Sequence, residues 1–291
     1  MDDRITTIRS RELGEGLRSV LKESGMSGRE VAAAMEWSPS RVSRLLNGQR
    51  GGSEAEVSLF LGVCKAKKAV RERLLKICRE INQPGWWQRH GSRLPVQLVT
   101  YIDHEDKAAA IHDFQLAIVP GALQTENYAR TLIRDCGAAP ASEVEDRVEA
   151  RIARRSIFAR PRPPRCTYFI HEQVLRFPVG DAEIMSEQLH YLLQMAVRNY
   201  ITVRVVPNSA GVHAGIAGSF SLLEFDEIRP VVYLESQTST LFLEEPVETD
   251  SYRRVLAGLA DKALDEGQSK EVIACLAIEL YGDREDHDDR A

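Results

Sequence analysis

Hydrophobic residues recur at helical spacing through the first 81 residues, and this pattern predicts five short helices. In the first of them Leu13, Leu17 and Val20 fall on one face, as in a helix that covers a core. The five helices are expected over Arg11–Ser24, twice within residues 27–47, over Ser53–Cys64 and over Lys67–Ile81. An N-terminal all-α domain is therefore expected.

The second and third helices are predicted within residues 27–47, which read SGREVAAAMEWSPSRVSRLLN. Ser27 can cap the second helix, with Glu30 completing a capping box three residues later. Ser38 can cap the third helix, whose first position is Pro39. Two capped helices joined by a tight turn are typical of a helix-turn-helix DNA reader, although a plain helical bundle with a basic face would show the same periodicity.

The third helix presents a polar face for DNA. If its apolar residues Val42, Leu45 and Leu46 point inward, its serines, arginines and asparagine point outward. Arginine can bind a guanine edge with two hydrogen bonds, and serine and asparagine can contact bases or phosphates. The expected DNA-binding residues are Arg29, Ser38, Ser40, Arg41, Ser43, Arg44, Asn47 and Arg50. Ser40, Arg41 and Arg44 are expected on bases and Arg50 on phosphate.

After about residue 95 the pattern alternates between short apolar runs and longer amphipathic stretches. Strands are expected over Phe114–Val119, Cys166–His171, Ile201–Val206, Ser219–Phe225 and Val231–Glu235. Helices are expected over Gln124–Cys136, Glu143–Ala159, Ala182–Arg198, Thr249–Glu266 and Ser269–Leu280. The predicted fold is multidomain, with an all-α helix-turn-helix domain (1–82), a linker (83–95), an α+β domain with a mixed sheet (96–281) and a disordered acidic tail (282–291).

Charge separates the two predicted domains. Residues 1–93 carry 18 Lys+Arg and 11 Asp+Glu, a balance of +7, whereas the other 198 carry 20 and 32, a balance of −12. A basic module suits a phosphate backbone, and an acidic body does not. The five cysteines have no CxxC spacing, and no apolar run approaches the roughly 20 residues that span a bilayer. A cytoplasmic protein without membrane contact is expected.

The sequence also resembles known families. REVAAAMEWSPSRVSRLLNGQR is similar to the reader of Xre/lambda-repressor-like regulators, which usually have Gln where Arg29 stands and often Glu where Leu46 stands. PGALQTENYARTLI, HEQVLRFPVG and VRVVPNSAGVHAGIAGSFSLLEF resemble the C-terminal domain of actinobacterial WhiJ-like, Scr-type antitoxin-like regulators. The resemblance implies a transcription factor that is often encoded beside a very small, toxin-like partner protein.

Two segments of the C-terminal domain are candidates for binding that partner or an effector. The first is a turn between a strand and a helix, at Pro120–Tyr128, and the second is the glycine-containing loop Asn208–Gly218. A well-capped turn and a loose connection are the plainer interpretations. The candidate partner or effector residues are Pro120, Gln124, Tyr128, His213 and Glu235.

The sequence does not favour an enzyme. His171-Glu172 begins like a zinc-protease motif, but Leu175 occupies the position of the second histidine. The glycine-rich stretch 211–220 lacks the Lys and Ser/Thr of a phosphate-binding loop. No catalytic residue, metal ligand or cofactor is therefore expected.

Together these patterns predict a sequence-specific transcriptional regulator that binds a double-stranded DNA operator as a homodimer. Its C-terminal domain is expected to bind a small partner protein or an effector. Two alternatives stay open at this point: an antitoxin that mainly sequesters a small toxin-like protein, and a repressor that senses a small molecule.

Overall fold

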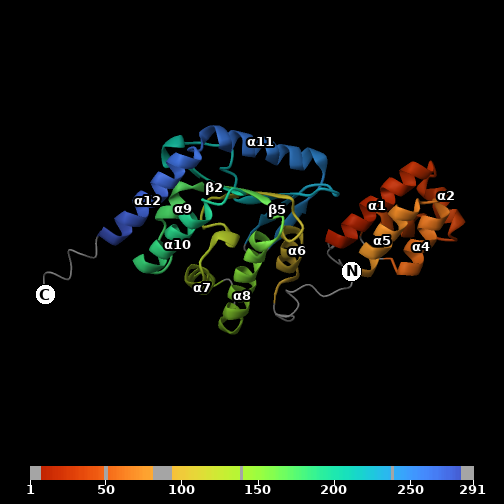
Figure 1. The fold of residues 1–291 in the computed structure, drawn as a ribbon, viewed down its shortest axis with the longest axis horizontal. Helices are drawn as coiled ribbons and strands as arrows, with labels where there is room; N and C mark the ends of the chain where they lie inside the picture. The colour runs from red at the N-terminus through yellow and green to blue at the C-terminus, as the bar shows by residue number, and fades with distance from the viewer. Residues whose placement is uncertain (1–7, 49–51, 81–93, 138–139, 237–238, 283–291) are drawn as a thin grey trace. The chain divides into compact units, whose positions relative to one another are not determined.

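The computed structural model describes residues 8–48, 52–80, 94–137, 140–236 and 239–282 (Figure 1). The chain divides into two compact units, Met1–Lys107 and Ala108–Ala291. In the described part, no helix is long and apolar enough to cross a membrane. The expected linker and the expected acidic tail lie outside the described residues, except for Leu94, Pro95 and Gly282.

The N-terminal unit is helical throughout its described part, which confirms an all-α domain. Its helices are α1 (Ile8–Ser24), α2 (Gly28–Ala34), α3 (Pro39–Leu46), α4 (Glu54–Val63), α5 (Lys68–Glu80) and α6 (Val96–Glu105), the last of which was not expected. Helices α1 to α5 enclose one core, in which Leu17, Val31, Val57, Phe60 and Leu61 are fully buried. Removal of these apolar side chains from water stabilises the bundle.

The turn between α2 and α3 is a Schellman motif with an unusual residue at its centre. The Trp37 amide donates to the Ala32 carbonyl at 2.8 Å, and the Glu36 amide donates to the Ala33 carbonyl at 3.2 Å. Glu36 has φ of 56°, a left-handed conformation that normally favours glycine. The tight turn therefore carries local strain, and it sets the direction in which α3 leaves α2.

Two glycines let α1 lie close to the end of α3. A Cβ on Gly14 would lie 2.5 Å from the Leu46 carbonyl oxygen, and one on Gly48 would lie 2.6 Å from the Ser10 carbonyl oxygen. Gly48 also has φ of 67°. Because larger residues would push the backbones apart, these glycines fix the position of α3 on the bundle.

The C-terminal unit is built on a six-stranded sheet with the order β3-β2-β1-β4-β5-β6. The strands are β1 (Ala110–Gln115), β2 (Arg165–His171), β3 (Ile201–Val206), β4 (Phe220–Glu224), β5 (Val231–Glu235) and β6 (Thr240–Leu243). Strands β1, β2 and β3 pair in parallel, and β4, β5 and β6 continue the sheet in antiparallel pairs. The sheet is mixed, as expected.

Helices cover both faces of this sheet (Figure 1). The helices are α7 (Glu126–Asp135), α8 (Val144–Ala153), α9 (Glu172–Arg176), α10 (Ala182–Met195), α11 (Pro246–Lys262) and α12 (Glu266–Gly282). Helix α11 packs on one face through Tyr252, Val255 and Leu256, against a core that includes Phe114 and Phe220. Figure 1 places α7 and α8 on the opposite side of the sheet.

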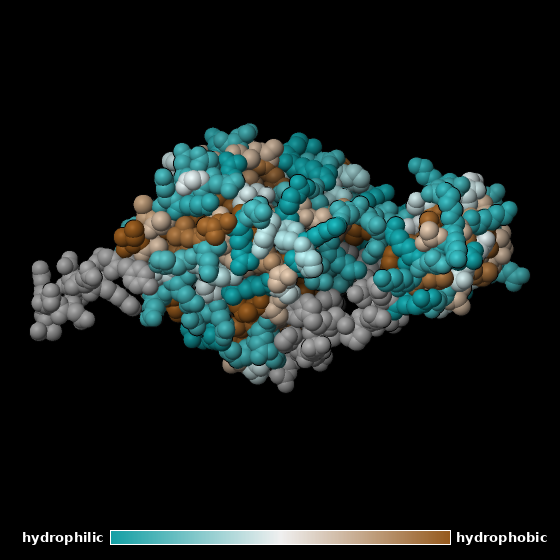
Figure 2. All heavy atoms as spheres, in the orientation of Figure 1, coloured by the Kyte–Doolittle hydropathy of each residue, from teal (hydrophilic) through white to brown (hydrophobic). Residues whose placement is uncertain are grey.

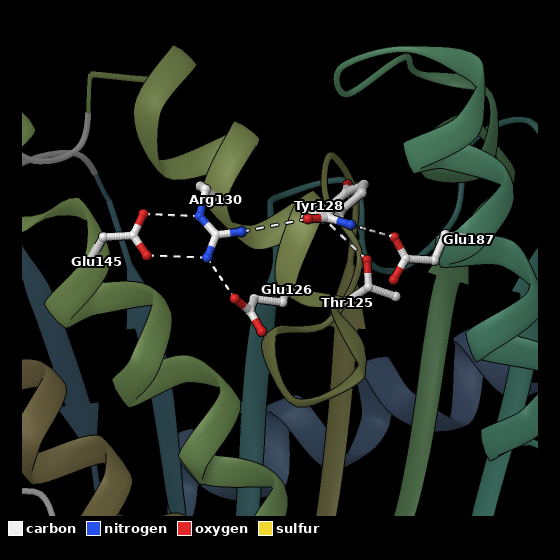
Figure 3. A network of polar contacts seen from close by, with 7 residues as sticks. Thr125, Glu126, Tyr128, Arg130, Glu145 and Glu187 are labelled. Carbon is white, nitrogen blue, oxygen red and sulfur yellow. Dashed lines mark hydrogen bonds and ion pairs between the residues drawn. The ribbon is translucent and has the colours of Figure 1, made fainter.

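A network of polar side chains ties α7 to its neighbours (Figure 3). Arg130 donates to both carboxylate oxygens of Glu145 on α8, at 2.9 and 3.1 Å, and to Glu126 at 2.5 Å. Asn127 donates to Glu187 on α10 at 2.9 Å. These carboxylates raise the pKa of Arg130, first through its hydrogen bonds with Glu145. Exposed pairs of this kind stabilise weakly, so the network mainly orients the helices.

Two expected elements differ from the structure, and two short elements of the C-terminal unit were not expected. The first strand was expected over Phe114–Val119 but spans Ala110–Gln115. The polar Asp113 interrupted the apolar pattern, yet it is buried and accepts a hydrogen bond from Ser221. The helix expected over Glu143–Ala159 becomes a 3-10 helix, η4 (Arg154–Ala159), after Ala153. Strand β6 and the short helix α9 were not expected.

We predict that Glu36→Gly stabilises the N-terminal unit by about 0.5–1 kcal/mol, because glycine adopts a positive φ without steric cost. Ala33→Gly, which places glycine at an exposed ordinary helical position of α2, should destabilise it by about 1 kcal/mol. Denaturant unfolding of the three proteins measures both effects. A lower stability for Glu36→Gly would contradict the strain assigned to this turn.

Candidate nucleic-acid interface

Helix α3 begins after the predicted cap residue, Ser38, and its apolar residues point to the core, as the sequence predicts. The Ser38 hydroxyl accepts a hydrogen bond from the Arg41 amide at 3.3 Å, and Pro39 occupies the first turn. Val42 and Leu45 are buried, and Leu46 is partly buried. This fixes the rotation of α3 about its own axis, so its polar residues must face away from the core.

The polar face of α3 contains four exposed residues that were predicted to bind DNA: Ser40, Ser43, Arg44 and Asn47. Among the described residues, the Arg44 side chain makes one long hydrogen bond, 3.4 Å, from its Nε to the Ser40 carbonyl within the same helix. Its guanidinium is therefore left at the surface of the helix. A guanidinium in this position can donate two hydrogen bonds to a guanine edge.

A hollow of about 600 Å³ lies between α3 and the start of α2. It is lined by Arg18, Ser27, Gly28, Arg29, Pro39, Val42, Ser43, Leu46 and Asn47. Three predicted DNA-binding residues, Arg29, Ser43 and Asn47, thus share one concave surface. Arg29 is exposed at the N-terminal end of α2, where its guanidinium can pair with a DNA phosphate.

Two predicted DNA-binding residues are engaged inside the domain. The Arg41 guanidinium forms an ion pair with Glu56 on α4 and lies 4.1 Å from the centre of the Trp37 ring. The Ser38 hydroxyl caps α3 and also lies 3.0 Å from the Ser40 hydroxyl. Arg41 would have to exchange these contacts for a base, so Arg44 is the better placed of the two arginines. Arg50 lies outside the described residues.

Arg18 of α1 belongs to this surface, although the sequence pattern assigned it no role. It donates to the Leu46 carbonyl at 2.8 Å and to the Asn47 side-chain oxygen at 3.2 Å. It also pairs with Glu15 at 2.7 Å. Arg18 therefore caps the end of α3 and orients Asn47. No local signal could have found it, because its partners lie 28 and 29 residues along the chain.

In the C-terminal unit, the candidates Pro120, Gln124 and Tyr128 are buried. The Gln124 side chain donates to the Val119 carbonyl at 2.7 Å, and the Tyr128 hydroxyl accepts from the Val119 amide at 3.3 Å. Thr125 caps α7, and its amide donates a hydrogen bond to the Gln188 side-chain oxygen at 2.7 Å. With no accessible surface on Gln124 and Tyr128, a partner protein cannot reach these two side chains in this conformation.

His213 is also buried, in the loop that precedes β4. Its ring lies edge-on to Phe114, with centroids 5.7 Å apart, and 5.4 Å from the ring of His171. Its Nδ1 accepts from the Gly215 amide at 3.2 Å. The residues beside it in the loop are the exposed ones, since Val212 is 84% exposed and Ile216 64%. Figure 2 shows that one face of the molecule is largely hydrophilic, with smaller apolar areas between.

Glu235, the last of the predicted C-terminal candidates, is exposed at the end of β5. Burial raises the pKa of the Tyr233 phenol, and the nearby Glu235 carboxylate raises it further. This carboxylate also interacts electrostatically with Arg151 of α8. Within the described ranges, no group of three or more His, Cys, Asp or Glu side chains could hold a metal ion.

A helix-turn-helix unit with a polar reader face defines a class, that of helix-turn-helix regulators, and suggests DNA binding. A helix-turn-helix domain model matches residues 12–74, in agreement with this class. A model described as a domain of unknown function, DUF5753, matches residues 98–274. The chain therefore belongs to the DUF5753 family. No curated protein and no solved structure matches it significantly.

We predict that Arg44→Ala weakens binding to a specific DNA site by about 1–3 kcal/mol, because it removes a donor pair from the reader face. Lys68→Ala removes the same charge from an exposed position at the start of α5 and should have a small effect on all sequences alike. Fluorescence anisotropy with a specific and a scrambled duplex measures both. Equal losses in the two variants would show that Arg44 contributes only general charge.

Proposed function

We propose that this protein is a non-enzymatic, sequence-specific transcriptional regulator that binds a double-stranded DNA operator as a homodimer. The observation that carries the proposal is the exposed face of α3, with Ser40, Ser43, Arg44 and Asn47, beside Arg29 at the start of α2. This face combines groups that can bind base edges with an exposed guanidinium that can pair with phosphate.

The distribution of charge supports the same division of labour. The first 93 residues carry a balance of +7, and the remaining residues carry −12. Phosphate affinity arises from release of condensed cations by basic side chains, so the N-terminal domain is the part that binds DNA. A single reader helix covers only a few base pairs, and a dimer doubles the site.

The second half of the proposal concerns the C-terminal domain, which we assign to binding of a small partner protein. Support comes from the loop 208–218, where Val212 and Ile216 are exposed on either side of the buried His213. Apolar side chains exposed together on one loop suit contact with another protein. The resemblance to antitoxin-like regulators points the same way, and an antitoxin that mainly sequesters its partner is the competing form of this function.

The DNA half predicts that the full chain selects a near-palindromic sequence from random duplexes. Two half-sites about one helical turn apart are expected, each read by one α3. The logarithm of the affinity should fall linearly with the logarithm of salt concentration. Selection followed by footprinting tests this, with Arg44→Ala as the control that loses the motif. Enrichment of no motif, with salt-sensitive binding retained, would reduce the function to non-specific DNA binding.

The partner-binding proposal predicts that the gene has a neighbour encoding a small protein that binds the full chain, and that the double variant Val212→Ser, Ile216→Ser loses this binding. Val197→Ser is a matched control, because Val197 is 75% exposed beyond the end of α10. Hydrogen exchange of the full chain should show protection of residues 208–218 on binding. Protection confined to other segments, or unchanged affinity of the double variant, would remove the loop from the interface.

A further inference from the structure

Positive charge is concentrated in one short segment of the otherwise acidic C-terminal domain. Residues 147–165 contain seven arginines and a single acidic residue, Glu149, although the domain as a whole carries an excess of acidic residues. Arg147, Arg151 and Arg155 are four residues apart, so they follow one side of α8 and the start of η4. All three are partly exposed. Each of the three residues therefore keeps some accessible surface.

Two of these arginines are held by neutral oxygen atoms instead of carboxylates. Arg151 donates to the Gln124 side-chain oxygen at 2.8 Å, and Arg155 donates to the main-chain oxygen of the same residue. The Gln124 amide nitrogen is already committed to the Val119 carbonyl, which fixes the orientation of the amide. Gln124 thereby holds both guanidinium groups in place without neutralising either one.

Other arginines of the same domain are paired with carboxylates. Arg130 lies between Glu126 and Glu145 (Figure 3), and Arg253 pairs with Glu224 and Asp250 at 2.8 Å. Among the described residues, Arg151 and Arg155 have no carboxylate within ion-pair distance, although Glu235 acts on Arg151 from further away. Unneutralised guanidinium groups held side by side are costly unless an anion joins them.

The surroundings of Arg151 and Arg155 raise the cost of leaving these two residues without an anion, and so favour binding of one. Burial and the nearby charge of Arg154 lower the pKa of Arg151 to about 10, so it stays protonated at neutral pH while repelled by its neighbour. The Arg155 guanidinium lies 4.6 Å from the centre of the Tyr191 ring, and its buried Nε has no hydrogen-bond partner among the described residues. Stacking on this ring favours a planar, charge-assisted contact by the Arg155 guanidinium.

We propose that Arg151 and Arg155, positioned by Gln124, bind an oxyanion group, carboxylate or phosphate, of a small-molecule effector. The inference rests on the proposed regulator for its biological meaning, since an effector acts there by changing DNA or partner binding. The binding site itself belongs to the C-terminal domain and is measured without DNA.

The experiment is a titration of the full chain with inorganic phosphate and with malonate, a dicarboxylate, at constant ionic strength. Broadening of the phosphate ³¹P signal reports binding, and malonate is scored by competition. A dissociation constant on the order of 1 mM is expected for so small an anion. Arg151→Gln and Arg155→Gln should each weaken binding about tenfold, the value of one charge-assisted hydrogen bond.

Arg162→Gln is the matched control, because Arg162 is exposed in the same arginine-rich segment and its loss changes the charge equally. It should alter binding by less than about twofold, as expected for a screened surface charge. Arg155→Lys keeps the charge but loses the planar fork, so it tests the site even if a glutamine variant fails to fold. It should weaken phosphate binding severalfold while circular dichroism stays unchanged.

The results of this titration distinguish the anion site from the proposed DNA binding. No binding of either anion, or equal losses in Arg162→Gln and the paired variants, overturns the site and leaves the DNA proposal intact. Binding of phosphate or malonate that depends on Arg151 and Arg155 supports the site, even if the chain selects no operator. Displacement of phosphate by a stoichiometric DNA duplex would overturn the small-ligand assignment, since the pair would then contact a DNA backbone.

Discussion

A buried polar side chain must find hydrogen-bond partners, and in the C-terminal unit this constraint converges on Gln124. Its side chain is fully buried, and its two ends bind the Val119 carbonyl and Arg151. Its own carbonyl accepts from Arg155. The turn after β1, the helix α8 and the 3-10 helix η4 are thereby fixed around one residue. Loss of the Gln124 side chain would take a partner from the Val119 carbonyl and from Arg151, at about 1–3 kcal/mol each.

The N-terminal unit meets the same constraint at its helix ends. Ser27 and Glu30 satisfy the first amides of α2, and Ser38 does so for α3. Arg18, from a different helix, then satisfies the carbonyl of Leu46, the last residue of α3. The consequence is a reader helix that is fixed at both ends, with an exposed polar face between them. Fixed geometry matters for DNA reading, because base contacts depend on the register of the helix in the groove.

Arginines serve three separate purposes in this chain. Arg44 is exposed at the reader face, Arg130 joins helices through carboxylates, and Arg151 and Arg155 are held by the neutral oxygen atoms of Gln124. The difference lies in the partner and not in the residue type. A carboxylate neutralises a guanidinium and makes it structural, whereas a neutral acceptor leaves its charge available for a ligand.

The sequence by itself determined what depends on residues close together in the chain. The caps at Ser27 and Ser38, and the inward position of Val42, follow from spacings of three or four residues, so the helices and the exposed face of α3 were predictable. The alternation of strands and helices in the second domain was predictable for the same reason, and it fixed the fold class.

Tertiary structure decided everything that depends on partners far along the chain. Asp113 lies within β1 because Ser221, 108 residues away in the chain, donates a hydrogen bond to its carboxylate. The sequence pattern could not show this partner, so the predicted strand began one residue after Asp113. Gln124 was expected at a surface but is buried by its contacts with Arg151 and Arg155. Arg41 was expected to read DNA, yet Glu56 and Trp37 hold its side chain. Local spacing fixes which face of a helix is polar, but only the packed fold determines which of those polar groups stay available.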